Sequence, residues 1–436
     1  MTRVTALRGD ELPEIRTAVP GPKSLAAAKR LRRAEGAAIW GVDSQPIVWA
    51  RARGAVVLDL DGNRFLDLTS GFGAASLGHA SPEIKRAVSA QAGRLVQGLG
   101  DLMPHRERDR LVRALSRVGG RLDRVLLAST GSEAVELALK TAALATGRRR
   151  MVAFTGSYHG DSLGALEVTH HPAPPGPIQA LLGGWAVHVA YGDLDSLERA
   201  LREGEPCAAV IAEPIQGRGG TVLPPPGFLA GLCALARQHG AVVIYDEVMT
   251  GAGRTGPFWA WERSGPEAEP DLLCAGKGIG GGVAIAAVFG RSRLMDAWRR
   301  HVPASGEAPH ASTFYAHPLA CAGALATLKR LTAPGLREEV ERKGRWLDDA
   351  LANLARRHRV GVRSTGLMAG IELPSDGSAG PAQARLASLW RGLLERGVLT
   401  IPSGTHGTVL QLLPPLTITD EQLAHGITAI DSVLAG

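Results

Sequence analysis

Short continuous apolar runs alternate with helical patterns through the middle of the chain. The runs predict strands that are buried on both faces, and they cover residues 124–128, 151–154, 208–212, 241–245, 271–275 and 284–289. Apolar residues recur at helical spacing between several of these runs, for example over residues 133–147 and 227–239. Strands and helices that alternate in this way predict an α/β large domain over residues 65–330, with a mostly parallel, doubly wound sheet.

The pattern differs at both ends of the chain. The segments expected after residue 334 are a charged helix at 335–357, a strand at 366–373, a helix at 382–396, an apolar segment at 409–419 and a last helix. This order predicts a smaller α+β domain over residues 331–436. Residues 1–64 hold a helical segment and the start of a β-hairpin around a DGN turn. We expect them to pack with the small domain, because neither piece carries enough apolar residues for a core of its own.

Composition narrows the class of protein. Hydrophobic residues make up 45% of the 436-residue chain and charged residues 21%, so a large core is expected. The net charge of +7 comes from scattered arginines without a basic stripe, which argues against nucleic-acid binding. No apolar run approaches the length of a membrane helix, and the first residues do not resemble a signal peptide.

The cysteines show no spacing typical of a metal site. They are Cys207, Cys233, Cys274 and Cys321. Three of them lie in apolar runs, so we interpret all four as reduced core residues of a cytoplasmic protein without a metal site.

Two of the predicted strands each deliver a candidate catalytic residue. Asp246 follows the run at 241–245, and Lys277 follows the run at 271–275 within a glycine-rich turn. Ligands of open α/β sheets bind outside the carboxyl ends of the strands, so both side chains are expected at one crevice. A pyridoxal phosphate (PLP) enzyme needs this pair, a lysine for the Schiff base and an acid for the pyridinium nitrogen. Taken singly, Asp246 would be interpreted as a turn cap and Lys277 as a surface lysine.

Further residues would complete a PLP site. Gly131 and Ser132 open a helix directly after a strand, where free N–H groups favour an anion such as the cofactor phosphate. Tyr158 follows another strand and could stack on the ring, with Val248 on the opposite face. Thr313 could reach the phosphate. Each residue alone also fits ordinary capping, packing or loop structure.

Several motifs together carry a resemblance to a known family. They include LGHASPEI, TGSEAVELALK, YHG, AEPIQGRGG, YDEVMTGAGRTG, CAGKGIGGG, STFYAHPLACA and LLPPLTIT. The chain resembles the class III (ω-amino-acid type) aminotransferases, which are PLP enzymes of fold type I. The resemblance spans nearly the whole chain and implies an enzyme that is at least a homodimer, with each active site at the subunit interface.

The resemblance also implies roles for individual residues. Lys277 would form the Schiff base with PLP, and Asp246 would hold the ring nitrogen. Tyr158 and Val248 would sandwich the ring, and Glu213 would orient groups beside the pyridine.

The resemblance also implies which residues hold the cofactor phosphate and which lie near the site. Gly131, Ser132 and Thr313 would hold the phosphate, with Thr313 reaching across from the other subunit. Arg254 would be a structural or ion-pair residue near the site.

The sequence departs from the family pattern where substrate is recognised. Gln411 stands where glutamate-using members carry an arginine, and Arg218 stands where a glutamate usually pairs with that arginine. Asp161 follows YHG, where members acting on γ-aminobutyrate or ornithine carry an arginine. Phe72, in the glycine-rich loop 70–79, is a further candidate substrate contact. We expect Arg218 to hold any substrate carboxylate, unless it points to solvent or pairs with a nearby acid such as Glu213 or Asp161.

The predicted function is transfer of an amino group between an amine or amino acid and a keto or aldehyde acceptor. Lys277 would carry the proton between the substrate Cα and the cofactor. The alternative is a PLP-dependent racemase or epimerase on the same scaffold, which needs a second acid/base facing Lys277. Arg218 is a poor candidate for that role because an arginine is effectively always protonated. The sequence names neither the donor nor the acceptor.

Overall fold

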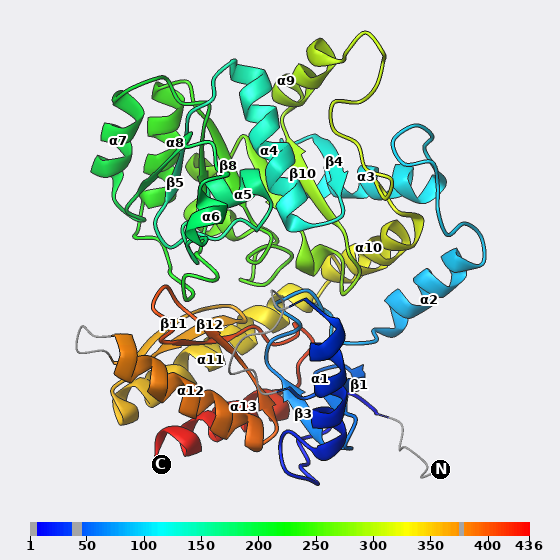
Figure 1. Cartoon of the computed structure of the whole chain (residues 1–436), viewed down its shortest axis with the longest axis vertical. Coiled ribbons are helices and arrows are strands. Elements are labelled where there is room, and N and C mark those ends of the chain that lie inside the picture. The colour runs from blue at the N-terminus through cyan, green and yellow to red at the C-terminus, as the bar shows by residue number, and fades with distance from the viewer. Residues whose placement is uncertain (1–6, 37–45, 375–378) are drawn as a thin grey trace.

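The computed structural model describes residues 7–36, 46–374 and 379–436. Figure 1 shows an upper part built around a central sheet and a lower part that contains both ends of the chain. Among the described helices, none is both long and apolar enough to cross a bilayer.

The upper part is organised by a seven-stranded sheet in the order β4-β10-β9-β8-β7-β5-β6. Its strands are β4 (Arg124–Ala128), β5 (Met151–Phe154), β6 (Ala186–Val189), β7 (Ala209–Ala212), β8 (Val242–Asp246), β9 (Leu272–Ala275) and β10 (Ala286–Gly290). Only β10 runs antiparallel to its neighbours, β4 and β9. The predicted α/β fold with a mostly parallel sheet is therefore confirmed.

Helices cover both faces of this sheet. Residues on alternating sides of β8 enter separate cores, because successive strand side chains point to opposite faces. Ile244 packs with α4 (Gly131–Thr146), whereas Val243 and Tyr245 pack with α8 (Phe228–Gln238) and α7 (Leu194–Arg202). Every residue of β5, β7, β8 and β9 is buried, as their continuous apolar sequences predict.

The lower part combines the N-terminal and C-terminal segments. Its sheets have the orders β1-β2-β3-β13 and β11-β12-β15-β14. Their strands are β1 (Trp49–Arg53), β2 (Val56–Asp59), β3 (Arg64–Asp67), β11 (Gly361–Thr365), β12 (Met368–Glu372), β13 (Val398–Leu399), β14 (Ile401–Ser403) and β15 (Val409–Leu412). Strands β2 and β3 form the predicted hairpin, and β3 pairs in parallel with β13. The boundary predicted between residues 64 and 65 thus falls inside β3, and the division into domains stays a prediction.

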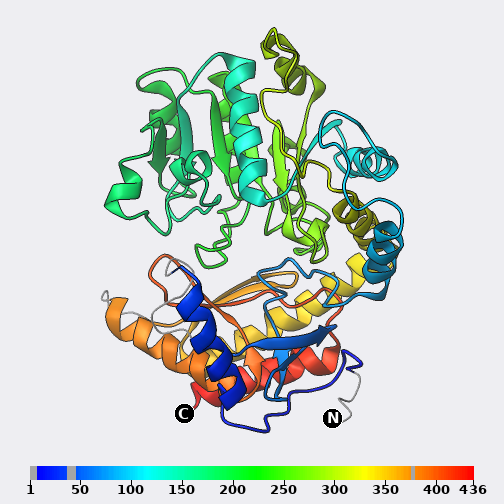
Figure 2. The same cartoon turned by 45° about the vertical axis from the view of Figure 1, so that its right-hand side comes forward.

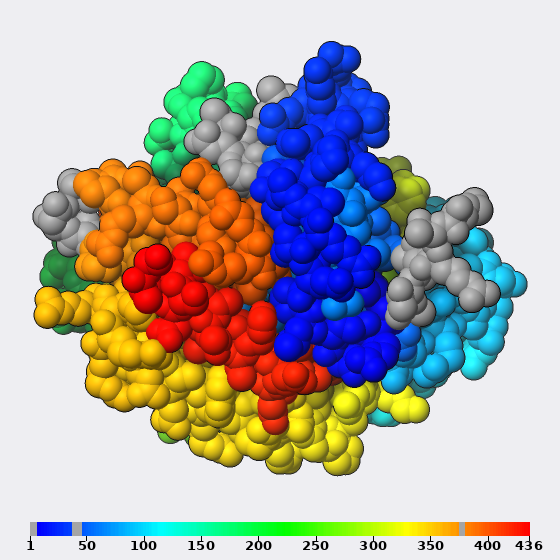
Figure 3. Space-filling view, turned by 90° about the horizontal axis from the view of Figure 1, so that it is seen from below, coloured from blue at the N-terminus to red at the C-terminus, as the bar shows by residue number. Residues whose placement is uncertain are grey.

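Helices close the lower part from below. They are α1 (Pro22–Ala34), α11 (Leu336–His358), α12 (Ala379–Glu395) and α13 (Asp420–Leu434). Figure 3 shows the N-terminal segment lying directly against the C-terminal helices on this face. The Asp61 carboxylate, in the β2–β3 turn, accepts hydrogen bonds from the first N–H groups of α1 at Lys23 and Ser24. These N–H groups have no partner inside the helix, so Asp61 ties α1 to the hairpin.

Six further α-helices are described. They are α2 (Pro82–Ala92), α3 (Arg106–Val118), α5 (Leu163–Glu167), α6 (Gly176–Gln179), α9 (Ser292–Met295) and α10 (Pro318–Leu331). Helix α10 packs against α2 and α3, and Figure 2 shows the three along one side of the molecule.

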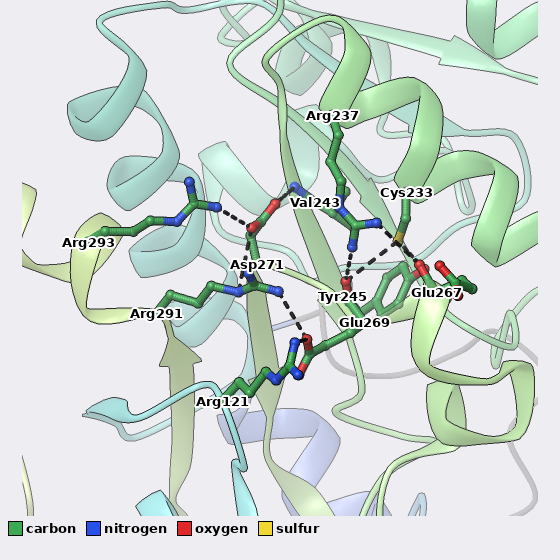
Figure 4. A network of polar contacts seen from close by, with 10 residues as sticks. All are labelled: Arg121, Cys233, Arg237, Val243, Tyr245, Glu267, Glu269, Asp271, Arg291 and Arg293. Atoms are coloured by element: carbon green, nitrogen blue, oxygen red, sulfur yellow. Dashed lines mark hydrogen bonds and ion pairs between the residues drawn. The ribbon is translucent and has the colours of Figure 1, made fainter.

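A polar network fixes the amino ends of β8 and β9, as Figure 4 shows. Asp271 directly precedes β9, and its Oδ2 accepts a hydrogen bond of 3.1 Å from the Val243 backbone N–H. Its Oδ1 accepts one of 2.9 Å from Arg293. Glu269 pairs with Arg291 at 3.0 Å. Each carboxylate thus faces a partly exposed guanidinium.

Candidate functional site

A cavity of about 400 Å³ lies at the opposite, carboxyl ends of the central strands. Its lining consists of Thr130, Gly131, Ser132, Tyr158, His159, Gly160, Asp161, Ser162, Glu213, Asp246, Val248, Met249 and Lys277. Most of the site residues predicted from the sequence therefore share one cavity, at the place where an α/β sheet binds ligands.

A second cavity is larger but does not lie at the carboxyl ends of the strands. A groove of about 580 Å³ runs between α2, α3 and α10, and its lining includes Arg94, Arg110, Arg117 and Lys329. Arg110, Arg117 and Lys329 lie on helices and Arg94 lies in the turn after α2, so none of these cations is at a strand end. The smaller cavity is the better candidate, because the chemistry-bearing loops of the sheet converge there.

Asp246 is the last residue of β8 and is almost fully buried. Its Oδ2 lies 2.9 Å from Nδ1 of His159, and its Oδ1 accepts a hydrogen bond of 3.0 Å from the Val248 backbone N–H. The other ring nitrogen of His159, Nε2, is buried and has no hydrogen-bond partner among the described residues. The carboxylate is thus held from two sides, as preorganisation of a charged group requires.

Lys277 follows β9 with a backbone φ of 38°, in the left-handed region that a non-glycine residue seldom adopts. Burial lowers the pKa of the Lys277 amine, and the nearby Arg218 acts in the same direction. The carboxylates of Asp246 and Glu213 oppose this shift. A lysine with a lowered pKa presents more of the neutral amine, which is the nucleophilic form.

Glu213 joins two loops that enclose the cavity. Its Oε1 accepts a hydrogen bond of 3.0 Å from the Tyr158 backbone N–H, and its Oε2 accepts one of 2.8 Å from Gly217. Burial raises the pKa of Glu213 to about 7, and Asp246 adds to the effect. The loops that follow β5 and β7 are therefore tied together through one buried carboxyl group.

The amino end of α4 forms another wall. Thr130 caps the helix, because its hydroxyl accepts a hydrogen bond of 3.2 Å from the Glu133 backbone N–H. A Cβ added to Gly131 would come within 2.8 Å of Val248 Cγ1, so only glycine allows this close contact. The hydroxyls of Ser132 and Ser162 lie 3.0 Å apart. Helix N–H groups and hydroxyls together make a favourable environment for an anion.

A tyrosine, an aspartate and an arginine meet at the rim. The Tyr158 hydroxyl donates a hydrogen bond of 2.9 Å to Asp161 Oδ2, and the Arg218 guanidinium carbon lies 4.8 Å from the centre of the Tyr158 ring. Burial and this hydrogen bond raise the pKa of Tyr158 to about 12. The Asp161 carboxylate therefore faces the tyrosine. In the described part of the chain, Arg218 makes no ion pair within 4.0 Å.

Two residues predicted near the site serve to hold loops. Gln411 on β15 is buried, and its Nε2 donates to the Gly217 carbonyl at 2.8 Å and to Thr221 Oγ1 at 3.1 Å. Buried Arg254 donates to the Leu367 and Pro414 carbonyls, and burial lowers its pKa to about 10. Neither residue lines the cavity.

Two other predicted residues lie on the surface. The Phe72 side chain is 57% exposed, and Thr313 is exposed on the segment before α10. The Thr313 carbonyl accepts a hydrogen bond of 2.6 Å from Gln97 Nε2. Neither residue is part of the cavity lining in this chain.

His159 and Ser162 also line the cavity, although no role for either was predicted from the sequence. His159 stands next to Tyr158 in the YHG motif, so a polar ring directly after a strand was the available signal. Its contact with Asp246 joins loops 87 residues apart, which sequence spacing does not reveal.

Comparison with known proteins defines the family. The model of the family named aminotransferase class-III matches residues 39–434. The chain belongs to this family. It is 36% identical over 379 residues to the acetylornithine aminotransferase of Methanosarcina mazei, covering 87% of this chain and 89% of that protein. It is 35% identical over 444 residues to the 4-aminobutyrate aminotransferase of Mycobacterium leprae, covering 96% and 97%.

A solved structure supports the same assignment. The PLP-bound amine transaminase from an uncultivated Pseudomonas species matches with a TM-score of 0.82 at 30% identity, over 92% of this chain and 99% of that one. The predictions of a class III aminotransferase and of PLP as its cofactor are confirmed. The racemase alternative is not favoured.

The cavity of this aminotransferase fits PLP by its own chemistry. It combines a lysine amine, a buried carboxylate backed by a histidine, and the amino end of a 16-residue helix. PLP presents an aldehyde, a ring nitrogen and a phosphate, and each has a matching group here. Among the described residues, no cluster of three or more His, Cys, Asp or Glu side chains could hold a metal ion.

Proposed function

We propose that the cavity holds PLP through Lys277 and Asp246 and transfers an amino group from an amine or amino acid to a keto or aldehyde acceptor. The observation that carries the proposal is that these two residues line one cavity, with His159 bonded to Asp246 at 2.9 Å. Bound PLP supplies the electron sink for the substrate Cα and carries the amino group between the two half-reactions.

Each wall of the cavity has a distinct task in this proposal. Asp246 keeps a proton on the ring nitrogen, and its bond to His159 holds the carboxylate in position. The backbone N–H groups of Gly131 and Ser132 bind the phosphate. Tyr158 and Val248 cover the two faces of the ring. Glu213 maintains the walls by accepting hydrogen bonds from both adjoining loops.

Lys277 also moves the proton. Once a substrate amine replaces it, the free Lys277 amine would take the proton from the substrate Cα as a general base and release it again as a general acid. The lowered pKa of the Lys277 amine supports this role, because a base must be unprotonated to act. Among the described lining residues, His159 is the other basic side chain, and it is engaged with Asp246. Two other titratable groups of the described lining also have hydrogen-bond partners: Tyr158 donates to Asp161, and Glu213 accepts from the backbone N–H groups of Tyr158 and Gly217.

We further propose that two copies of the chain form a homodimer in which Thr313 reaches the partner's phosphate site. Large apolar side chains gather at exposed positions near Thr313, namely Leu95, Val96, Leu99, Leu102, Met103 and Phe314. The Gln97–Thr313 hydrogen bond ties this apolar segment to the Thr313 loop. A group of six large, exposed apolar side chains favours a protein–protein interface. Sedimentation velocity on Leu102→Asp, compared with Leu163→Asp at an exposed site on α5, tests the dimer. A monomeric wild type would contradict it.

A panel of amino donors and of keto or aldehyde acceptors, tested on the PLP-loaded enzyme, identifies the substrates. The names of the relatives suggest ω-amino acids and their derivatives as donors, and the half-reaction with each donor can be followed by the change in cofactor absorbance. A cytoplasmic location stays a prediction, and the four free, buried cysteines are compatible with it.

The central test is Lys277→Ala. We expect loss of turnover and of the absorbance band of lysine-linked PLP, because no second lysine lines the described cavity. Borohydride reduction of the wild type followed by peptide mapping should label Lys277. Lys329→Ala, on the exposed face of α10, is the matched control and should retain the band. A label on another lysine, or turnover by Lys277→Ala, would contradict the proposal.

A further inference from the structure

Arg218 is held at the rim of the cavity by the sheet of the small, C-terminal part. The loop that carries it reads Gly217-Arg218-Gly219-Gly220, a composition that gives the backbone wide conformational freedom. The Arg218 carbonyl accepts hydrogen bonds of 3.0 Å from Ser403 Oγ and from the Gly404 N–H. A glycine-rich loop is thereby anchored at the residue whose side chain reaches the site.

Side chains from two further strands hold the rest of the loop. Gln411 on β15 donates to Gly217 and Thr221, and Arg363 on β11 donates to the Gly220 carbonyl at 3.1 Å. Gln411 is buried with 1% exposure, so its amide is committed to these contacts. The loop therefore has one defined position, and so does the backbone of Arg218.

No carboxylate of the described residues forms an ion pair with Arg218 within 4.0 Å. Asp161 accepts from the Tyr158 hydroxyl, and Glu213 accepts from two backbone N–H groups. Arg218 instead lies over the Tyr158 ring, which lines the cavity. Arg218 is exposed, and its positive charge contributes to the lowered pKa of His171, whose first cause is burial. Since Arg218 makes no ion pair within 4.0 Å in the described chain, its guanidinium is available to bind an anion.

We infer that Arg218 binds a substrate carboxylate remote from the reacting carbon, and that Gln411 and Ser403 position Arg218 for this contact. The inference rests on the proposed function. Lys277 lines the cavity, whereas Arg218 is exposed and lies 4.8 Å from the ring centre of the lining residue Tyr158, so the two ends of such a substrate would meet separate groups. A guanidinium can grip a carboxylate through two parallel hydrogen bonds, but only in a defined orientation. The small-domain contacts supply that orientation through the backbone.

A matched pair of donors tests the contact. 4-Aminobutyrate and n-butylamine have the same carbon chain and amine, and only the first carries a carboxylate. We expect Arg218→Gln to lower the ratio of their half-reaction kcat/KM values about tenfold to a hundredfold, as loss of a charge-assisted hydrogen bond predicts. Using the ratio cancels any effect of the variant on the chemistry common to both donors. Arg345→Gln, at an exposed position on α11, is the control and should keep the wild-type ratio.

Variants of Gln411 and Ser403 test whether these residues position Arg218. Gln411→Met keeps the volume but removes both donated hydrogen bonds, and Ser403→Ala removes one. Each should lower the same ratio about threefold to tenfold through KM for 4-aminobutyrate, as expected for loss of a neutral hydrogen bond. Ser403→Thr keeps the hydroxyl and should restore the ratio. A purely structural defect would lower the rates with both donors equally, and that result would overturn the positioning role.

The outcomes separate this inference from the proposed function. Suppose that PLP is bound at Lys277 in the wild type but neither donor changes its absorbance. The proposed use of such amines as donors is then contradicted, and the inference about Arg218 is overturned with it. If both donors react and the wild-type ratio is near one, or Arg218→Gln leaves it unchanged, the inference alone is overturned and transamination stands.

Discussion

The two ends of the central sheet carry similar charged side chains in opposite arrangements. At the amino ends of β8 and β9, Glu269 and Asp271 face arginines that keep contact with solvent (Figure 4). At the carboxyl ends, Asp246 and Glu213 are buried and accept hydrogen bonds from His159 and from backbone N–H groups, without an arginine partner within 4.0 Å in the described chain.

The difference indicates that the carboxylates at the amino ends stabilise the fold, whereas those at the carboxyl ends serve the chemistry of the site. Carboxylates with partly exposed arginine partners need little further compensation. Buried carboxyl groups without such partners are costly, and the raised pKa of Glu213 reports that cost. Perturbed groups of this kind concentrate at functional sites. The same type of substitution should therefore have different consequences at the two ends.

The largest effect is expected for Asp246→Asn. The neutral amide cannot stabilise a proton on the ring nitrogen, and preorganised electrostatics of this kind are worth about 3–4 kcal/mol. PLP should stay bound, while the single-turnover rate with an amino donor falls about a hundredfold to a thousandfold. Stopped-flow absorbance measures this rate. Rates near the wild-type value would argue against the role assigned to Asp246.

The next largest effect is a pH dependence of the free energy of unfolding that arises from Glu213. Burial raises its pKa to about 7 from the ordinary glutamate value of 4.5, so the native state keeps a proton that the unfolded chain has already lost between these pH values. The stability contribution of Glu213 therefore falls as the pH rises from about 4.5 to about 7, and then stays level. At one pKa unit per 1.36 kcal/mol, the change is at most about 3 kcal/mol.

Glu213→Gln should remove this dependence. We expect its free energy of unfolding, measured on the apoprotein, to rise relative to the wild type across the same pH window. Glu421→Gln, an exposed position on α13, is the control. Parallel pH profiles for wild type and Glu213→Gln would contradict the expected shift.

A smaller effect on stability is expected for Asp271→Asn at the amino ends. Asp271 accepts from the Val243 backbone N–H and from Arg293, and loss of the charge weakens both contacts. The free energy of unfolding should fall by about 1–3 kcal/mol, the range for hydrogen bonds to charged groups. The single-turnover rate should stay at the wild-type value, because Asp271 lies at the far end of the strand. A slowed half-reaction would break the distinction between the two ends.

The sequence predicted the strands and the residues that follow them, because both signals are local. A continuous apolar run predicts a buried strand, and the rule for α/β sheets then brings Asp246 and Lys277 to the same edge. The hairpin around the DGN turn was also confirmed. Family motifs extended the prediction to residues that share the cavity, such as Glu213.

Contacts between distant segments could not be predicted in this way. The direction of the Gln411 side chain depends on the register of β15 against β12, where Gln411 pairs with Gly370, and a shift by one residue would reverse it. The partners of Arg254 are carbonyls on two separate segments rather than an acid. Such contacts follow from how the small sheet meets the loops of the large one.

The smallest effect is expected for Arg121→Ala, which tests how much a surface charge adds at the amino ends. The Arg121 side chain is 81% exposed, and its Nη1 lies 3.7 Å from Glu269. Glu269 keeps its closer partner, Arg291, at 3.0 Å. Exposed pairs of this kind contribute about 0–1 kcal/mol, so the free energy of unfolding should fall by less than about 0.5 kcal/mol. Denaturant unfolding at low and at high salt measures the change, and Arg291→Ala, at 27% exposure, should cost more. If Arg121→Ala lowered the free energy of unfolding more than Arg291→Ala, solvent exposure would not explain the small contribution of the Arg121–Glu269 pair.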